Sequence, residues 1–276
     1  MTRHPSALIY DADCNGTSLV TPHFFEVPIG VLGDAHRIAE TEYGYGTSQA
    51  NTVISQMTSL YLTARNRDVV IIFNPGGWGW ASISQMPFWA TILNGMQQAL
   101  EKMGQKVMIL NYLRTTRSLS GMLGEAGALI KLSRAKGHEL ALQAEYLVRH
   151  LPRLKVIIAG ESNGAAMAED AMRFLRDNRR IFSVQTGTPF WAPSTPHPRS
   201  LIINHNGTEP DSFSNGNLCR IITANIQSLF GRYKGSQGNI LFYIGAPGHV
   251  YNWEYSVVRE KITAFLQQTV LSVTSP

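Results

Sequence analysis

The pentapeptide Gly160-Glu161-Ser162-Asn163-Gly164 has the spacing of a catalytic serine held on a sharp turn. It follows the apolar run 155–159 and precedes a segment rich in alanine. A strand-to-helix turn of this kind strains the serine backbone and projects its hydroxyl at a helix N-terminus, where negative charge is favoured. The pattern therefore predicts that Ser162 is a nucleophile, and the alternative is a serine that caps an ordinary helix.

A serine nucleophile needs a base, and histidine is the usual one because its pKa lies near neutrality. His249 ends the segment Gly-Ala-Pro-Gly-His, after the apolar run 240–244 and before the last helical pattern. This place late in the chain is the one expected for a base that serves Ser162. The alternative is a structural histidine, and His205 is the nearest rival for the role.

Two carboxylates follow the apolar run 201–204, and either one could orient the imidazole of His249. Asp211 is preferred because aspartate is the commoner acid in such triads. Glu209 stays open as the alternative acid, since it stands directly before a proline in the same loop.

A glycine-rich loop, Pro-Gly-Gly-Trp-Gly, follows the apolar run 68–74. Glycines allow backbone N–H groups to approach a substrate oxygen, so the loop is a candidate oxyanion hole. We expect Gly77 to donate one hydrogen bond, with Trp78 next in line, and the N–H of Asn163 to donate the other. The alternative is a tight turn with a packed tryptophan. The sequence contains neither a phosphate-binding loop nor a dinucleotide fingerprint.

Short apolar runs alternate with longer amphipathic ones from about residue 48 onward, which predicts a parallel sheet covered by helices on both faces. The fold class is therefore α/β, a three-layer αβα sandwich with a mostly parallel sheet of about six strands. Ligands gather at the carboxyl ends of such strands. Residues 1–47 do not share this rhythm, so we expect an N-terminal arm or edge segment packed on a domain of residues 48–276. The expected strands are 68–74, 106–111, 155–159, 181–185, 201–204 and 240–244, and the expected helices are 48–66, 85–103, 139–150, 165–177, 218–233 and 255–271.

Taken together, these motifs resemble the α/β-hydrolase family over about residues 66 to 271. The resemblance implies a Ser-acid-His triad, a covalent acyl-enzyme, and no metal or organic cofactor. Two departures stand out. The oxyanion loop begins Asn74-Pro75 where many esterases have histidine, and the family's first two strands are hard to find in residues 1–47. The chain is thus similar to shortened, cutinase-like or thioesterase-like members.

The expected reaction is hydrolysis of a carboxylic ester of a small-molecule or lipid-like acyl substrate, as in esterases and lipases. Trp80, Phe190 and Trp191 fall in strand-end loops and could line an apolar acyl pocket, although packing explains them as well. Residues 113–136 mix apolar, glycine and basic residues and could form a mobile flap or a solvated crossover helix. The alternatives are an acyltransferase or thioesterase with the same triad, or an inactive binding protein.

The composition of the 276-residue chain narrows the classes of partner. Its net charge of +5 is spread without a dense basic run, which argues against nucleic-acid binding. Its two cysteines are too few for a disulfide framework and lack metal-ligand spacing. The N-terminal apolar stretch is too short for a signal peptide, and no run reaches the length of a membrane span. We therefore expect a soluble cytoplasmic protein without membrane insertion, for which transient membrane contact is possible.

Overall fold

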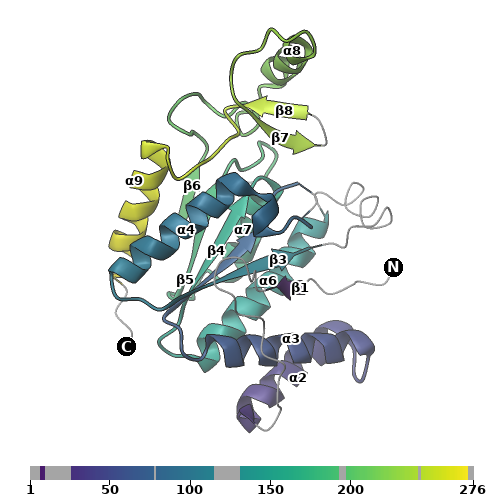
Figure 1. The fold of residues 1–276 in the computed structure, drawn as a ribbon. Coiled ribbons are helices and arrows are strands. Elements are labelled where there is room, and N and C mark those ends of the chain that lie inside the picture. The colour runs from purple at the N-terminus through teal and green to yellow at the C-terminus, as the bar shows by residue number, and fades with distance from the viewer. Residues whose placement is uncertain are drawn as a thin grey trace.

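A six-stranded sheet forms the centre of the computed structural model, which describes residues 7–9, 26–77, 79–114, 131–192, 197–241 and 244–272 (Figure 1). The strands lie in the order β1-β3-β2-β4-β5-β6, and all are parallel except β1, which pairs antiparallel with β3 at one edge. The fold class predicted from the sequence is confirmed. The strands are β1 (Ala7–Ile9), β2 (Val69–Asn74), β3 (Val107–Leu113), β4 (Lys155–Glu161), β5 (Ile181–Thr186) and β6 (Ser200–Ile203).

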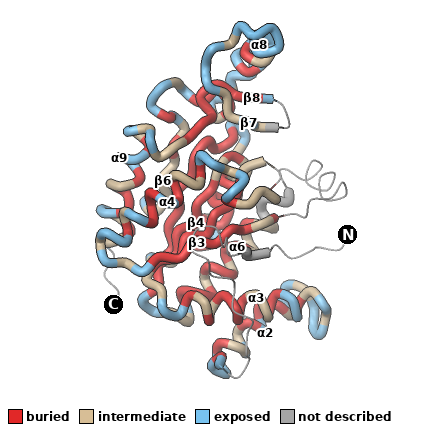
Figure 2. Tube along the Cα trace, viewed as in Figure 1, coloured by how far each residue is buried: buried red, intermediate tan, exposed pale blue. Residues whose placement is uncertain are grey.

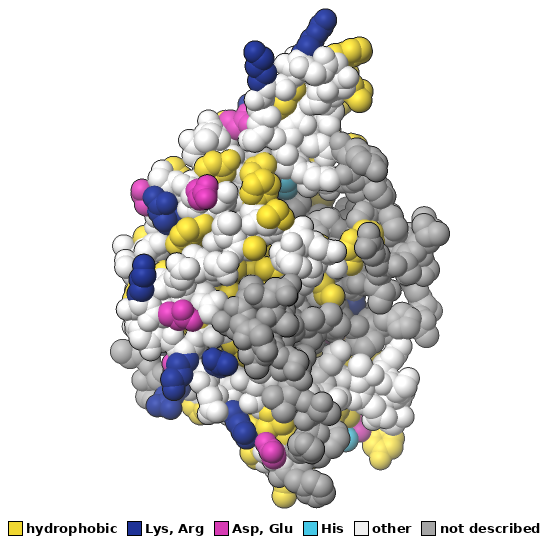
Figure 3. Space-filling view, in the orientation of Figure 1, with side chains coloured by type: hydrophobic (Ala, Val, Ile, Leu, Met, Phe, Trp, Pro, Cys, Tyr) yellow, Lys and Arg dark blue, Asp and Glu magenta, His cyan; other side chains and the backbone are white. Residues whose placement is uncertain are grey.

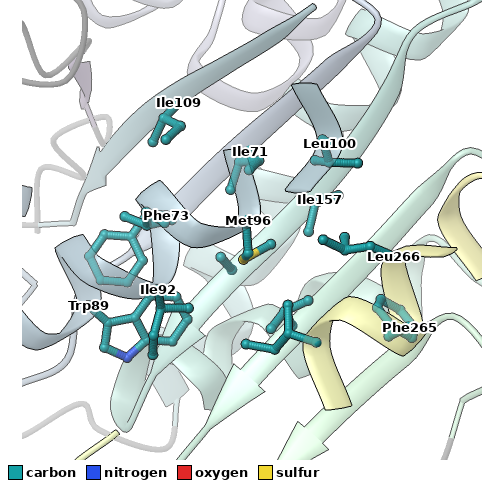
Figure 4. Packing of buried hydrophobic residues seen from close by; sticks show 14 of the residues in the cluster. Ile71, Phe73, Trp89, Ile92, Met96, Leu100, Ile109, Ile157, Phe265 and Leu266 are labelled. Atoms are coloured by element: carbon teal, nitrogen blue, oxygen red, sulfur yellow. The ribbon is translucent and has the colours of Figure 1, made fainter. Parts of the chain in front are cut away.

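Helices cover both faces of this sheet, and the sheet itself is the most buried part of the molecule (Figure 2). Helices α4 (Pro87–Lys102) and α9 (Ser256–Phe265) pack on one face; Figure 4 shows this apolar core from close by. The opposite face is covered by the helices α3 (Ser48–Ala64), α6 (Lys131–His150) and α7 (Asn163–Phe174).

Strand β2 shows why these strands are apolar throughout. Its alternate residues Val69, Ile71 and Phe73 belong to the core beneath α4 and α9, whereas Val70 and Ile72 belong to the core on the other face. Side chains of a strand point alternately to opposite faces, so a strand covered on both sides has no polar face.

The N-terminal segment contributes more than an arm. After β1, a helix that the sequence did not reveal, α2 (Ile29–Tyr43), packs against α3 and α6. Ala35 and Ala39 of α2 share an apolar cluster with Met57 of α3 and Tyr146 of α6. Asp34 of α2 also contacts Arg149 at the end of α6, at 2.8 Å. The domain boundary at residue 47 stays a prediction. The apolar cluster contains residues from both sides of that boundary.

One predicted strand is wrong in its bounds and in its pairing. The sequence predicts residues 240–244 as the last strand of the parallel sheet. Instead, β7 (Gln237–Leu241) and β8 (Ile244–Pro247) form a separate antiparallel hairpin, over which the helix α8 (Leu218–Leu229) lies. The sixth strand of the main sheet is β1. An apolar run identifies a strand but not its partner, because pairing depends on distant residues.

Two further boundaries bear on the site. Helix α7 begins at Asn163, immediately after Ser162, two residues earlier than predicted. Helix α6 begins at Lys131, earlier than the predicted start at residue 139. The predicted flap over residues 113–136 falls largely on residues 115–130, which lie outside the described residues, and its last six residues are the first turns of α6.

Candidate active site

The turn at Ser162 joins the carboxyl end of β4 directly to the N-terminus of α7. Ser162 has φ 52° and ψ −121°, and within the described residues it is the only one other than glycine with a positive φ. Both flanking glycines are sterically required. A Cβ on Gly160 would lie 2.5 Å from the carbonyl oxygen of Gly164, and a Cβ on Gly164 would lie 2.1 Å from that of Asn74. Such a strained conformation persists only where its surroundings enforce it.

Backbone hydrogen bonds anchor this turn to the sheet and to the helix. The N–H of Ser162 donates to the carbonyl oxygen of Thr186 at 3.0 Å, and its own carbonyl accepts from Ala166 at 3.1 Å. Since Thr186 ends β5, the serine lies where β4 and β5 both end. Its surface is only 3% exposed, so bulk water has little access to it.

His249 and Asp211 form a buried pair in the loops that follow β8 and β6. The distance between His249 Nδ1 and Asp211 Oδ2 is 2.7 Å, and the two side chains are 2% and 0% exposed. The other carboxylate oxygen of Asp211 accepts from the backbone N–H groups of Phe213 and Ser214. Burial raises the pKa of Asp211, but the hydrogen bond and charge of His249 outweigh it, and the net pKa is lowered. The carboxylate is therefore held ionised.

The imidazole of His249 reaches the strand end where Ser162 lies. Gly187 directly follows Thr186, and a Cβ on Gly187 would come within 2.5 Å of His249 Cε1. Thr186 in turn accepts the N–H of Ser162. The outer ring nitrogen, His249 Nε2, is buried and has no hydrogen-bond partner in the part of the chain that the structure describes. With Nδ1 turned to Asp211, this nitrogen is the one available to accept a proton.

Glu209, the alternative acid, lies apart from His249 Nδ1 and has other partners. Its Oε2 is 2.5 Å from a guanidinium nitrogen of Arg220, and its Oε1 accepts from the N–H of Gly248 at 3.1 Å. The structure thus brings Asp211 to the imidazole and gives Glu209 a role in joining two loops.

Two side chains at Asp211 were not found from the sequence. The hydroxyl of Tyr251 donates to Asp211 Oδ2 at 2.7 Å, and the hydroxyl of Ser214 donates to the same oxygen at 3.0 Å. The Asp-Ser-Phe-Ser segment from Asp211 was the available signal for Ser214, because an aspartate often accepts hydrogen bonds from the residues two and three positions on. Tyr251 gave no comparable signal, since its hydroxyl reaches across from another loop.

A buried asparagine holds together the loops that carry Asp211 and His249. Asn206 Nδ2 donates to the carbonyl oxygens of Gly248 and Val250, at 3.2 and 3.0 Å. Its Oδ1 accepts from the N–H of Thr208. His205, the rival base, accepts from the N–H of Gly207 in the same turn.

The glycine-rich loop after β2 lies against the serine. A Cβ on Gly76 would be 3.4 Å from Ser162 Cβ. Gly77, at φ 57°, has its carbonyl oxygen fixed by Asn163 Nδ2 at 3.2 Å and by Arg114 Nη2 at 2.8 Å. The loop is therefore tied to the serine turn on one side and to the end of β3 on the other. The backbone N–H of Asn163 belongs to the first turn of α7, where N–H groups have no partner within the helix. Trp78 lies outside the described residues.

A second carboxylate, Glu161, lies beside the serine. A Cβ on Gly76 would be 3.2 Å from Glu161 Oε2, which puts this carboxylate next to the glycine-rich loop. Burial raises the pKa of Glu161 to about 7; the charge of His249 opposes this rise and that of Asp211 adds to it. Glu161 occupies a variable position of the Gly-x-Ser-x-Gly pattern, so the pattern did not identify it as a candidate site residue.

Aromatic rings lead from the surface to His249. Phe213 lies 5.1 Å from the His249 ring and 5.0 Å from Trp191, between ring centroids, and Trp191 in turn meets Phe190. Phe190 and Trp191 are 47% and 40% exposed, so they form a solvent-facing rim. Trp80 is half-buried after the glycine-rich loop.

The described residues include no cluster of three or more His, Cys, Asp or Glu side chains that could hold a metal ion. They also include no helix with the length and apolar character needed to cross a membrane.

No family model and no curated protein matches the sequence. Among solved structures, the chain is similar to "Trichoderma reesei cutinase in complex with a C11Y4 phosphonate inhibitor". The two are 16% identical, the match covers 88% of this chain and 93% of the cutinase chain, and the TM-score is 0.43. With so low an identity and TM-score, the chemistry of the site has to be judged from this chain's own residues.

Proposed function

We propose that the protein is a serine hydrolase of the α/β-hydrolase type that cleaves carboxylic esters through an acyl-enzyme on Ser162. One observation carries the proposal: the buried His249–Asp211 pair leaves His249 Nε2 unpartnered among the described residues, at the strand end where Ser162 lies. The chain order Ser162, Asp211, His249 is that of this type of hydrolase.

In the first half of the reaction, Ser162 Oγ attacks the carbonyl carbon of the ester while its proton passes to His249 Nε2. Asp211 stays ionised and stabilises the imidazolium that forms. Its lowered pKa fits this role, because a carboxylate that took up the proton would no longer hold the ring in place. Collapse of the tetrahedral intermediate breaks the ester C–O bond, and the alcohol leaves with the proton from His249.

The negative charge of the intermediate needs donors that are already in place. The N–H groups of Asn163 and Gly77 are the proposed pair, the first at the positive end of α7. The side chain of Asn163 and that of Arg114 hold the carbonyl oxygen of Gly77, which fixes the orientation of the loop. Fixed donors need no reorganisation when charge develops, and loss of one such donor typically costs a factor of about 10² to 10³ in kcat.

In the second half, His249 removes a proton from water, and the hydroxide attacks the acyl carbon. The second tetrahedral intermediate releases the acid and returns the proton to Ser162 Oγ. The buried ring of Phe213 borders His249, and the exposed ring of Trp191 packs against Phe213, so an apolar acyl or alcohol group at the site would contact these rings.

A fluorophosphonate probe tests the proposal, because it reacts covalently with an activated serine. We expect labelling of the wild-type protein, no labelling of Ser162→Ala, and hydrolysis of p-nitrophenyl esters that depends on the same serine. Ser214→Ala is the matched control, because it removes a serine hydroxyl that lies in the same site but donates to Asp211. Labelling that persists in Ser162→Ala, or its absence in the wild-type protein, would contradict the proposal.

A further inference from the structure

Helix α8 carries an apolar face that nothing in the described structure covers. Leu218, Ile222, Ile226 and Leu229 are spaced by four, four and three residues, and Phe230 caps the helix. Residues at these spacings lie along one side of a helix. They are 53%, 59%, 51%, 84% and 71% exposed. We call these five residues the α8 stripe.

The stripe is distinct from the side of α8 that packs on the hairpin. Ile221 and Ala224 are buried there, and Ile221 shares a small core with Phe213 and Ala246. Asn225 adds two hydrogen bonds to the backbone of Gly245, at 2.7 and 3.0 Å. These contacts hold α8 against the hairpin, and none of them involves a residue of the stripe.

The charged residues on α8 and just beyond it are all basic. Residues 212–253 contain no aspartate or glutamate, whereas Arg220, Arg232 and Lys234 lie on α8 or just beyond it, all exposed. Of these three cations, only Arg220 forms an ion pair with a described carboxylate, that of Glu209. Figure 3 shows this tip of the molecule, with Lys and Arg side chains beside hydrophobic ones. An exposed apolar stripe flanked by cations matches a helix that lies in the headgroup region of an anionic membrane.

The N-terminal end of α8 begins near the rim of the candidate active site. A Cβ on Gly216 would be 3.3 Å from the ring of Phe190, and Leu218 follows two residues later. From Phe190 the aromatic contacts run through Trp191 and Phe213 to His249. The first turn of α8, where the stripe begins, therefore lies near this aromatic rim.

We propose that the α8 stripe, with Arg232 and Lys234, docks the protein on the surface of an anionic lipid bilayer. A second copy of the chain is the less favourable occupant, because two such tips packed face to face would bring their unbalanced cations together. The docking does not depend on the proposed hydrolysis and would remain in a protein that lacks Ser162.

Flotation with lipid vesicles tests the docking. We expect the protein to bind vesicles of equal parts phosphatidylcholine and phosphatidylglycerol and to bind pure phosphatidylcholine vesicles far less. The stripe variant Ile222→Ser/Ile226→Ser/Leu229→Ser should lose at least about tenfold in affinity. The charge variant Arg232→Gln/Lys234→Gln should lose about fivefold for each cation removed. Ile29→Ser is the matched control, since Ile29 is 91% exposed on α2 and should not affect binding.

Hydrolysis of a soluble ester by each variant separates docking from catalysis. All three should retain the activity of the wild-type protein, which also shows that they fold. Equal binding of neutral and anionic vesicles, or full binding by the stripe variant, would overturn the docking. So would a wild-type dimer that the stripe variant abolishes without any vesicle binding. Vesicle binding by a protein with no esterase activity would overturn the proposed function and leave the docking intact.

Discussion

Tyr251 and His249 both contact the same carboxylate oxygen, Asp211 Oδ2, each at a distance of 2.7 Å. The phenolic hydroxyl donates from one side, while Nδ1 of the imidazole approaches from another. Because the ionised carboxylate can only accept, the shared oxygen favours the imidazole tautomer with its proton on Nδ1. That tautomer leaves Nε2 free to accept the proton of Ser162.

Tyr251→Phe should weaken this arrangement without opening a cavity. The loss of one donor raises the pKa of Asp211, because the ionised carboxylate loses a hydrogen bond that stabilises it. The stability that comes from the lowered pKa of Asp211 is present above its unfolded value of 3.8 and is lost as the pH falls. The variant should therefore lose about 1 to 2 kcal/mol of unfolding free energy at neutral pH, and less at pH 3.

Tyr45→Phe is the control for this comparison, because Tyr45 is 87% exposed. Its unfolding free energy should match that of the wild-type protein at both pH values. An equal loss of stability at pH 7 and pH 3 in Tyr251→Phe would show that the tyrosine does not act through the charge of Asp211.

Replacement of the two candidate acids should have very unequal effects. Asp211→Asn removes the charge that holds His249 and should lower kcat by a factor of about 10³ to 10⁴. Glu209→Gln keeps an oxygen that can accept the N–H of Gly248 and loses only the charge that faces Arg220. It should change kcat less than about threefold, as is usual for a partly exposed pair. Steady-state rates with p-nitrophenyl acetate decide between the acids, and a larger loss in Glu209→Gln would reverse their roles.

The features that the sequence predicted are those with a local cause. The turn at Ser162 needs glycines at fixed positions, because Gly160 and Gly164 touch backbone of neighbouring elements. Likewise, strands buried on both faces, such as β2, produce continuous apolar runs that are easy to find. The mostly parallel direction of the strands follows from such runs and the helices between them.

The features that the sequence did not predict depend on contacts between distant segments. The hairpin of β7 and β8 has an apolar run like those of the main sheet, and such a run carries no information about its partner. The hydroxyl of Tyr251 reaches Asp211 across two loops. Helix α2 was missed although its buried residues Val31, Ala35, Ile38 and Ala39 have helical spacing, and its burial depends on contacts with α3 and α6.

Glu161→Gln should stabilise the protein, and more so at higher pH. Burial raises the pKa of Glu161 from 4.5 to about 7, so the native state holds its proton more tightly than the unfolded chain does. Stability contributed by this group therefore falls as the pH rises from 4.5 to about 7, and the cost is complete above that range. A tenfold change in a proton-binding constant corresponds to about 1.4 kcal/mol, so the advantage of the neutral glutamine should reach about 1 to 3 kcal/mol.

Urea unfolding at pH 5 and pH 8 measures this difference directly. The gap between Glu161→Gln and the wild-type protein should widen at pH 8. Glu254→Gln, at an exposed position in the loop before α9, should show the same small difference at both values. An equal gap for Glu161→Gln at both pH values would mean that the carboxylate does not titrate in this window.

Gly164→Ala should be among the most damaging single-methyl additions in the chain. The new Cβ would lie 2.1 Å from the carbonyl oxygen of Asn74, so α7 would have to move away from the end of β2. Overpacking against rigid backbone costs about 3 kcal/mol or more, and the displaced serine turn should also lower kcat. Gly33→Ala is the matched control, because Gly33 lies in the exposed side of α2 with no atom within 4 Å of the added Cβ. Alanine there should stabilise the helix by about 0.5 to 1 kcal/mol. Urea unfolding of the two variants gives opposite signs if the contact between Gly164 and Asn74 holds α7 in place, and a stable, fully active Gly164→Ala would refute that contact.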